Sequence, residues 1–310
     1  MLSYIRLSKY PKRFESFTGL TIEEFDDLHA KMESKYVEHE NKRLSRKDRK
    51  RTIGGGRGFK LELIDRLLML LVYYRLYITY FFTGFLFNLD QSNVYRNIKY
   101  LEPLVKVCIP LPEKVHKKTR RIGNMEELLE YFLEMKVFID ATEQEIPRPK
   151  NKRRRKNYYS GKKKRHTVKT QIMVNKKGMI LHKTKHVNGK KHDYELFKKK
   201  RPTLPPDVEI GMDLGYQGVE KDFPHLKVNI PHKKKKGKDL SKKDKRYNKK
   251  LSRERVIVEH TIGRMKKFRI VGNEFRNRVR RYDTVFSIVS GLVNFKLMYL
   301  EGFNLTAFVG

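Results

Sequence analysis

Three acidic side chains occupy positions from which they could act on a phosphate. Asp140 follows the short apolar stretch 134–139, and Asp213 follows a second one, 208–212. Both stretches are typical of buried strands, and a carboxylate at a strand end faces a crevice. With Glu259, they form a group of three acids in a strongly basic chain. Bound divalent cations would explain such a group, because hard cations prefer carboxylate oxygens. Two ions about 3.5–4 Å apart can bind a scissile phosphate, so the pattern predicts metal-dependent phosphoryl transfer.

Glu259 lies in the stretch 251–270, whose periodicity predicts a helix. Its expected buried face consists of Val258, Ile262, Met265 and Phe268. Arg255, Glu259 and Lys266 fall within roughly 40° of one another at about 100° per residue. The two cations are therefore placed to orient Glu259 or to hold a neighbouring phosphate. On its own, the stripe equally fits a solvated helix face with an Arg–Glu pair.

The charge of the chain indicates a polyanionic partner. The sequence has 310 residues, with 72 basic against 35 acidic side chains and a net charge of +37. A membrane surface is less favoured than nucleic acid, because no uncharged apolar run reaches the roughly 18–20 residues of a span. The start of the chain lacks the apolar core of a signal peptide, and a lone Cys108 excludes an internal disulfide framework. We expect a soluble intracellular nucleic-acid protein, with His182 and His186 as strand residues.

The first third of the sequence predicts helices. Thr21 and Glu24 form a capping box for a helix to about Tyr36, and the charged stretch 38–57 is expected to be a linker or loop. Stretches 61–77, 79–86 and 91–100 predict three further helices, the last capped by Asp90. A short helix, a tight turn and a capped polar helix are typical of a helix-turn-helix. The residues expected to face outward and read bases are Gln91, Ser92, Asn93 and Arg96. A helical bundle without a role in DNA binding remains the alternative.

The remainder predicts a mixed α/β fold. Pro103, Pro110 and Pro112 are expected to interrupt the helices, followed by a basic connector at 114–123. The expected strands are 134–139, 166–174, 178–187, 208–212 and 226–230, and the expected helices are 192–200, 251–270 and 285–300. This order indicates a mixed sheet with helices on its faces.

Two basic runs, 148–165 and 232–250, are expected to be loops inserted between these elements. Solvated low-complexity loops are one interpretation, but each run lies between a candidate acid and the next core element, which favours phosphate binding. The predicted contacts are Arg153, Arg154, Arg155, Lys162, Lys163, Lys164, Lys233, Lys234 and Lys235.

Several motifs resemble one known family. VFIDATEQEI around Asp140, IGMDLGYQG around Asp213 and RERVIVEHTIGRMKKF around Glu259 are similar to the DDE triad of the IS5-type insertion-sequence transposases, which are related to Harbinger-like enzymes. Arg255, Glu259 and Lys266 have the spacing of that family's signature, whereas Ser252 stands where the family has tyrosine. YYSGKKKRHTVK, GKKHDYELF and FTGLTIEEF also resemble the family, so the likeness covers nearly the whole chain.

The resemblance implies an RNase H-like catalytic core with an N-terminal helix-turn-helix domain. It implies an enzyme that binds terminal inverted repeats, cleaves DNA at the element ends and joins the 3′-hydroxyls to target DNA. Two Mg²⁺ or Mn²⁺ ions on Asp140, Asp213 and Glu259 would support the reaction, and the active form would be a homodimer or a higher assembly on double-stranded DNA. We expect the cytoplasm, with the bacterial nucleoid, or the nucleus in a eukaryote.

The expected domains are an N-terminal helix with a basic linker at 1–57, the helix-turn-helix at 58–123, the catalytic domain at 124–303 and a tail at 304–310. Three other functions stay open. They are an inactive, transposase-derived DNA-binding protein, a general nuclease and an RNA-binding protein. The last of these would leave the three acids without a function.

Overall fold

The structure is a computed structural model that describes residues 1–45, 58–122, 125–205, 207–234 and 237–301. Its chain divides into two compact units. The helical unit comprises Met1–Pro110, Lys267–Ile270 and Phe295–Gly310. The sheet unit comprises Leu111–Lys266 and Val271–Asn294. In the described part of the chain, no helix combines the length and apolar character that crossing a membrane requires.

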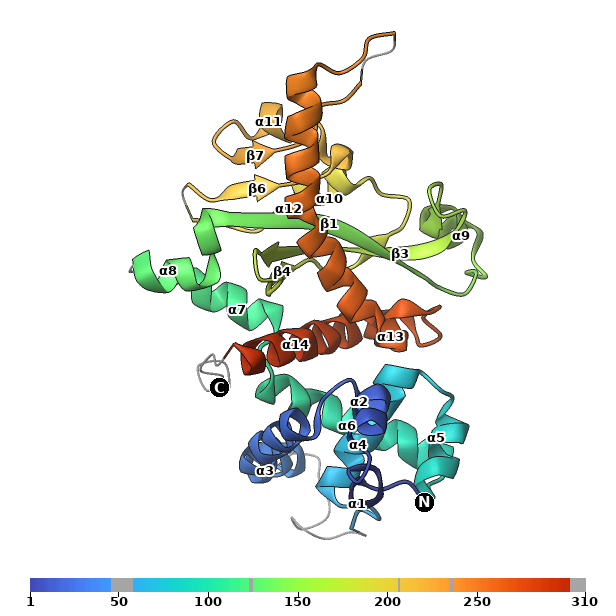
Figure 1. The fold of residues 1–310 in the computed structure, drawn as a ribbon. Coiled ribbons are helices and arrows are strands. Elements are labelled where there is room, and N and C mark those ends of the chain that lie inside the picture. Colours follow the sequence, from blue (N-terminus) through green and yellow to red (C-terminus); the bar gives the residue numbers. More distant parts are fainter. Residues whose placement is uncertain (46–57, 123–124, 206, 235–236, 302–310) are drawn as a thin grey trace. The chain divides into compact units, whose positions relative to one another are not determined.

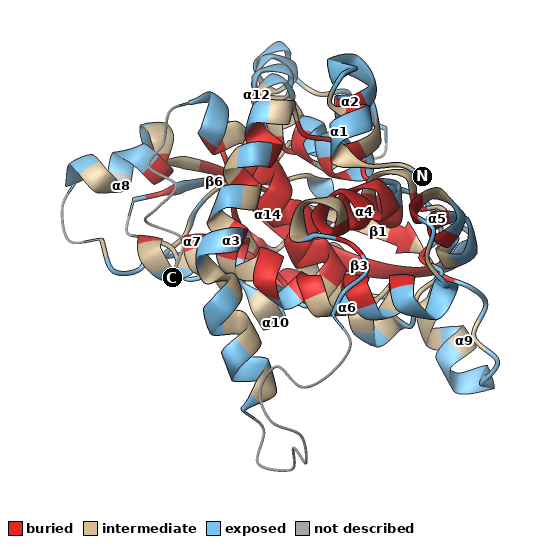
Figure 2. Ribbon diagram, turned by 90° about the horizontal axis from the view of Figure 1, so that it is seen from below, coloured by how far each residue is buried: buried red, intermediate tan, exposed pale blue. Residues whose placement is uncertain are grey.

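Six helices make up most of the helical unit (Figure 1). They are α1 (Tyr4–Leu7), α2 (Pro11–Thr18), α3 (Ile22–Leu44), α4 (Leu63–Leu76), α5 (Tyr80–Phe87) and α6 (Gln91–Cys108). The apolar helix α4 is buried along most of its length (Figure 2). The predicted capping box is confirmed, because Glu24 N donates to Thr21 Oγ1 and Thr21 N donates to the Glu24 carboxylate.

Helix α3 is longer than its sequence predicts. It continues to Leu44, so the predicted linker at 38–57 is wrong for residues 38–44, and residues 46–57 lie outside the described residues. The additional turns pack on α6, where Tyr100 donates a hydrogen bond to Glu40 and its ring contacts His39. These tertiary contacts stabilise a polar segment that has little helical signal of its own.

The predicted helix-turn-helix geometry is present in α5 and α6. Asn88, with a left-handed backbone, ends α5, and the Asp90 side chain caps α6 by accepting from Ser92 N at 2.7 Å. Gly84 is required at the turn, because a Cβ there would lie 2.3 Å from the backbone oxygen of Leu89. The backbone N–H of Leu89 in turn donates to Gly84 O at 2.9 Å.

Helix α6 is also longer than the sequence predicts. The expected interruption at Pro103 is wrong, because α6 passes through this residue and ends at Cys108. Buried polar contacts with α4 hold the helix in the turns before the proline: Arg66 Nε donates to Asn97 at 2.8 Å, and Tyr74 donates to Glu102 at 2.8 Å. Leu104, Val105 and Cys108 are buried after it. Such contacts outweigh the hydrogen bond that a proline removes from a helix.

The sheet unit contains the predicted mixed sheet. Its strands are β1 (Lys136–Glu145), β2 (Tyr159–Ser160), β3 (Arg165–Asn175), β4 (Ile180–Lys183), β5 (Val187–Asn188), β6 (Glu209–Gly211) and β7 (Lys227–Asn229). The order is β2-β3-β1-β6-β7, and β4 and β5 also pair with β3. β1 runs antiparallel to β3 and parallel to β6.

Helices and 3₁₀ turns complete this unit. They are α7 (Pro112–Thr119), α8 (Met125–Tyr131), η1 (Leu133–Met135), α9 (Lys152–Tyr158), α10 (Asp193–Lys200), η2 (Leu214–Tyr216), α11 (Val219–Asp222), α12 (Lys242–Lys266), α13 (Arg269–Gly272), η3 (Val279–Arg281) and α14 (Tyr282–Leu300). α12 crosses β1 and β3 (Figure 1). α13 and α14 have residues in both units.

Two predictions for the sheet are wrong in extent. Asp140 lies inside β1 instead of at its end, because the long β3 continues to pair with β1 as far as Glu145. The single strand expected at 178–187 is divided into β4 and β5, since His186 N leaves the sheet to donate to Asp283 on α14.

Three stretches expected to be basic loops or connectors contain helices. The connector at 114–123 is largely α7, whose first residue is Pro112, a favourable residue at the first helical position. The run 148–165 contains α9, capped by Asn151, and the run 232–250 contains the first turns of α12, where Ser241 accepts from Asp244 N. Side-chain caps explain the helices of these two runs despite their charge.

The predicted helix 251–270 is also interrupted. α12 ends at Lys266 because the chain turns back there, with Gly272 packed so closely that a Cβ would lie 2.3 Å from Lys266 O. Phe268 is buried but is therefore not part of α12. Val258 and Met265 do form its buried face, joined by Leu251 and Thr261, whereas Ile262 is only partly buried.

Candidate active site

The sheet register brings Asp140 and Asp213 side by side. In the parallel pair β1–β6, Phe138 is opposite Gly211, and each acid lies two residues further along its chain. Asp213 follows β6, as predicted, and caps η2 by accepting from Gly215 N at 2.8 Å. Two carboxylates on adjacent parallel strands thus reach the same edge of the sheet.

The electrostatics of Asp140 confirm that charged groups lie close to it. Burial raises the pKa of Asp140 to about 6, and the negative charges of Asp213 and Asp193 add to this effect. A hydrogen bond from Ala141 N and the positive charge of Arg255 act in the opposite direction. A buried carboxyl beside two other acids is a site at which a cation would be stabilised.

Helix α12 presents its predicted charged stripe to these acids. Arg255 and Lys266 both interact electrostatically with Asp140. The Lys266 side chain is exposed overall, but shielding of its amino group and the charge of Lys163 lower its pKa. Glu259 is exposed on the same stripe, between these two cations along the helix. The two cations of the stripe therefore lie near Asp140.

The three predicted ligands are not preassembled. In the described ranges, no group of three His, Cys, Asp or Glu side chains is close enough to hold a metal ion as it stands. The Asp140–Asp213 pair has the hard oxygen chemistry that suits a divalent ion. The buried Nε of Arg255 has no hydrogen-bond partner among the described residues, which leaves a donor available for a carboxylate or phosphate oxygen.

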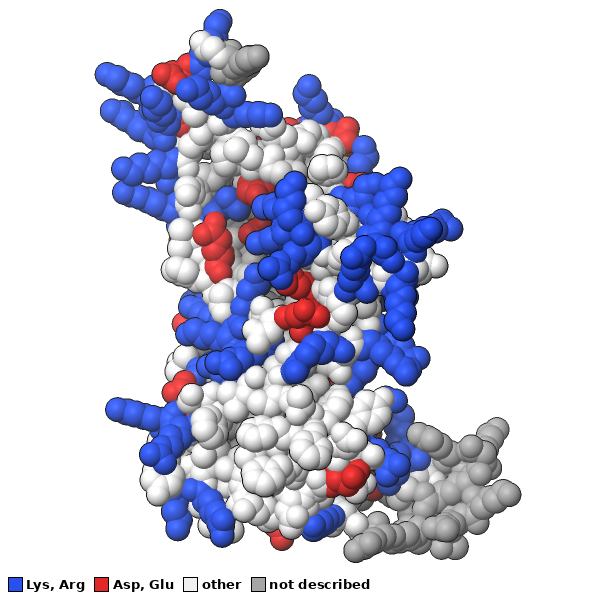
Figure 3. All heavy atoms as spheres, turned by 90° about the vertical axis from the view of Figure 1, so that its right-hand side faces the viewer, with Lys and Arg blue, Asp and Glu red and all other residues white. Residues whose placement is uncertain are grey.

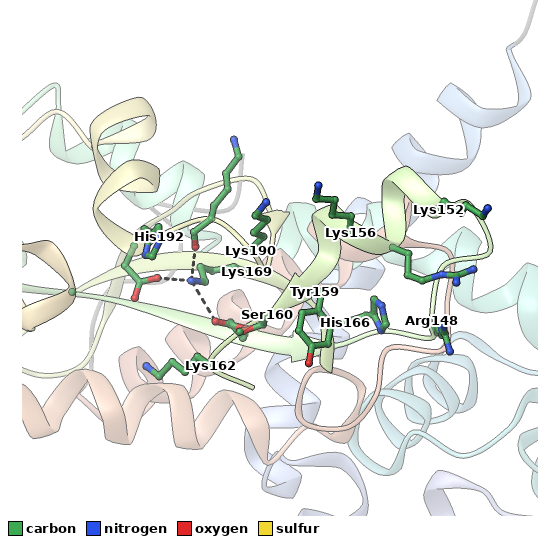
Figure 4. Close-up of a pocket in the computed structure, with 17 residues that line it drawn as sticks. Arg148, Lys152, Lys156, Tyr159, Ser160, Lys162, His166, Lys169, Lys190 and His192 are labelled. Carbon is green, nitrogen blue, oxygen red and sulfur yellow. Dashed lines mark hydrogen bonds and ion pairs between the residues drawn. The ribbon is translucent and has the colours of Figure 1, made fainter. Parts of the chain in front are cut away.

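A buried lysine beside the acids was not predicted. Lys169 on β3 is only 6% exposed. Its Nζ lies 2.8 Å from Asp193 Oδ1 and 3.3 Å from Glu143 Oε1, and donates to Lys191 O at 2.7 Å (Figure 4). The sequence feature that could have predicted this network is a lysine within the otherwise uncharged strand HTVKTQIMV. A lysine buried in a strand needs a charged or polar partner.

Lys169 pairs with a fourth acid, Asp193, next to the candidate site. A Cβ on Gly215 would lie 2.9 Å from Asp213 Oδ1 and 3.3 Å from Asp193 Oδ2, so both carboxylates approach the same backbone position. Asp193 begins α10, which packs on η2 and β3. Tyr216 is also buried here, where burial and the nearby acids Asp193, Asp140 and Asp213 raise its pKa.

The predicted DNA-contacting residues lie on two sets of elements. The four on α6, namely Gln91, Ser92, Asn93 and Arg96, are exposed at its N-terminal end. Of those in the sheet unit, Arg153, Arg154, Lys162, Lys163, Lys164, Lys233 and Lys234 are exposed, whereas Arg155 is half-buried and donates to Pro149 O and Lys150 O. Lys235 lies outside the described residues. On the face drawn in Figure 3, basic side chains surround a few acidic ones. The role of these residues in DNA binding stays a prediction.

Comparisons with known proteins identify the class. A family model described as "DDE superfamily endonuclease" matches residues 139–294, which include Asp140, Asp213 and Glu259. A second model, "Helix-turn-helix of DDE superfamily endonuclease", matches residues 59–111. The chain belongs to the transposases of the DDE endonuclease superfamily.

This assignment is supported by similarity to the probable transposase for insertion sequence element IS702 from Microchaete diplosiphon. The two sequences are 35% identical over 252 residues, which cover 81% of this chain and 86% of the relative. No solved structure shows a significant match to the chain. The narrower IS5-type assignment is not tested by these matches and stays a prediction.

Proposed function

We propose that the protein is the transposase of an insertion sequence. It binds the terminal inverted repeats through α6, cleaves DNA at the element ends and joins the 3′-hydroxyls to target DNA. The observation that supports this most strongly is the juxtaposition of Asp140 on β1 and Asp213 directly after the parallel β6, with Arg255 and Lys266 of α12 near Asp140. The narrower RNase H-like fold agrees with the mixed sheet and belongs to the proposal, as do the predicted domain boundaries and the cytoplasmic location.

The catalytic residues in this proposal have separate tasks. Asp140 and Asp213 would hold divalent cations, Mg²⁺ or Mn²⁺, and Glu259 would complete the ligand set. Two such ions would activate the attacking hydroxyl and stabilise the leaving oxygen. The buried Nε of Arg255, which has no hydrogen-bond partner in the described ranges, orients Glu259 or a phosphate oxygen. Lys266 contributes a second positive charge beside Asp140.

Binding of DNA in this proposal depends on the basic surface. The cations of α9, of the β2–β3 turn and of the segment before α12 contact phosphates, and α6 provides contacts to base edges. A homodimer or higher assembly would bring two element ends together. Phosphate contacts of this kind give an affinity that decreases steeply with salt.

A cleavage assay with matched variants tests the proposal. The full chain is incubated with DNA carrying the inverted repeats that flank its reading frame, with and without Mg²⁺, and nicks at the ends are mapped. We expect Asp140→Asn, Asp213→Asn and Glu259→Gln to abolish nicking while DNA binding in a gel-shift assay is retained. Glu220→Gln, an exposed acid on α11, is the control and should nick normally.

The results separate the alternatives. Binding without metal-dependent nicking by the unaltered chain would identify a DNA-binding descendant that no longer cuts. Nicking without preference for the ends, and without strand joining, would identify a general nuclease. Normal nicking by Glu259→Gln would show that the third ligand is assigned wrongly.

A further inference from the structure

A cavity of about 1040 Å³ lies next to the candidate active site within the sheet unit. Glu143, Lys169, Asp193 and Gly215 line one part of it. Gly215 is the position that Asp193 and Asp213 both approach, so the wall of the cavity is continuous with the group of acids. The remaining lining comes from α9, β2, the turn after β2 and the loop before α10.

The cavity walls are strongly basic. Its lining includes Arg148, Lys152, Lys156, Lys162 and Lys190, all drawn in Figure 4. Within the described part of the chain, none of these five side chains forms an ion pair with an acid. The one buried cation, Lys169, is already paired with Glu143 and Asp193. The free cations are therefore available for an anionic ligand such as phosphate.

An aromatic ring in the same cavity has the geometry of a stacking platform. Tyr159 is 43% exposed. Its ring is supported by His166, its partner across the β2–β3 pair, with ring centroids 5.6 Å apart and planes inclined by 70°. A fixed ring with an exposed side, surrounded by cations, is typical of sites that bind unpaired nucleotides.

The volume of the cavity suits a small part of a DNA strand. Pockets of about 300–1,000 Å³ enclose molecules of small-ligand size, and at about 1040 Å³ this cavity has room for one or a few nucleotides. Cations along the walls and one aromatic ring match the phosphate and the base of a single strand.

We propose that this cavity binds an unpaired nucleotide at the DNA end, next to the phosphate that is cut. The base stacks on Tyr159, and the flanking phosphates contact the Lys and Arg side chains of the wall. The position next to the cut rests on the proposed transposase function, because it is the acids beside Gly215 that locate the scissile phosphate. Unpairing costs least where a base is already unpaired, so frayed or overhanging ends should bind better than blunt ends.

The test uses the full chain in EDTA, so that binding is measured without cleavage. The probes are a short blunt duplex and the same duplex with a one-nucleotide 3′ overhang of 5-iododeoxyuridine, which also photocrosslinks to aromatic side chains. We expect the overhang to bind about 5-fold tighter or more, in line with stacking of one base on one ring. The crosslink should map to Tyr159 by mass spectrometry.

Two variants identify the ring. Tyr159→Ala should remove the preference for the overhang, whereas Tyr159→Phe, which keeps the ring, should retain it. Tyr10→Ala, at an exposed tyrosine of the helical unit, is the control and should behave as the unaltered chain. Equal affinity for the two probes, or a crosslink outside the cavity, would overturn the proposal.

Failure of this proposal differs from failure of the proposed function. Asp140→Asn should lose nicking but keep the overhang preference, because stacking on Tyr159 requires no metal. An unaltered chain that never nicks DNA, yet prefers the overhang and crosslinks at Tyr159, would refute the enzymatic function and support the cavity as a nucleotide site.

Discussion

Replacing Lys169 by methionine is the most informative test of the acidic network. Methionine has a similar length but no charge, so Glu143 and Asp193 would lose their shared cation. Their side chains are 7% and 19% exposed, and Lys169 itself is 7% exposed at the side chain. Removing one partner from a buried ionic group costs about 3–5 kcal/mol. We therefore expect Lys169→Met to lower the free energy of unfolding of the sheet unit by about that amount.

Thermal unfolding followed by circular dichroism at neutral pH would measure this loss. Lys198→Met is the matched control, because Lys198 is a surface lysine whose ion pair with Asp222 is solvent-exposed, and it should leave the melting temperature nearly unchanged. Adding Asp193→Asn to Lys169→Met removes one unpaired charge and should recover part of the loss. If Lys169→Met has the same melting temperature as the Lys198→Met control, the network is not buried in solution and our account of it is incorrect.

Three further predictions follow from other parts of the molecule. Gly84→Ala should destabilise the helical unit by about 1–3 kcal/mol and weaken DNA binding, since the added Cβ would collide with Leu89 O. Its control is Gly263→Ala on α12, where the added Cβ meets open space and should stabilise the protein against thermal unfolding by about 0.5–1 kcal/mol. Burial opposes ionisation of Asp283, but hydrogen bonds from His186 outweigh it and lower its pKa. Stability from this contact is present above the unfolded-state pKa and is lost as the pH falls through the folded-state pKa, so acid titration of the melting temperature should be less steep in Asp283→Asn. Replacing Lys162, Lys163 and Lys164 together by alanine should reduce the slope of log affinity against log salt by up to about 2.7, at about 0.9 per phosphate contact, whereas equal slopes would place these lysines outside the DNA interface.

The sequence was sufficient to predict the elements that have strong local signals. The capping box at Thr21, the Asp90 cap and the alternation of apolar strands with helices are local patterns, and the structure has each of them. The paired positions of Asp140 and Asp213 could be anticipated as well, because each follows an apolar run. The predictions were wrong at the ends of elements, where tertiary contacts decide how far a helix or strand extends.

The errors at these ends have a common physical origin. Residues 38–44 are helical because Tyr100 and α6 contact them, and β1 continues past Asp140 because β3 supplies partners as far as Glu145. Neither contact is visible in the local sequence. The prediction of Asp140 at a strand end was therefore wrong, although the side chain still reaches the edge shared with Asp213 through the parallel register of β1 and β6.

The fold also separates acids that are paired inside the protein from the proposed metal ligands, which a list of carboxylates in the sequence cannot do. Glu143 and Asp193 are bound to Lys169, so their charge is already balanced within the protein. Among the described residues, no lysine forms an ion pair with Asp140 or Asp213, and burial together with the charge of Asp213 raises the pKa of Asp140 to about 6. An incoming cation would relieve the repulsion between these two carboxylates, which the nearby charges of Arg255 and Lys266 offset only in part. By this argument, removing Lys169 should loosen metal selectivity as well as stability, because it returns two competing carboxylates to the same edge of the sheet.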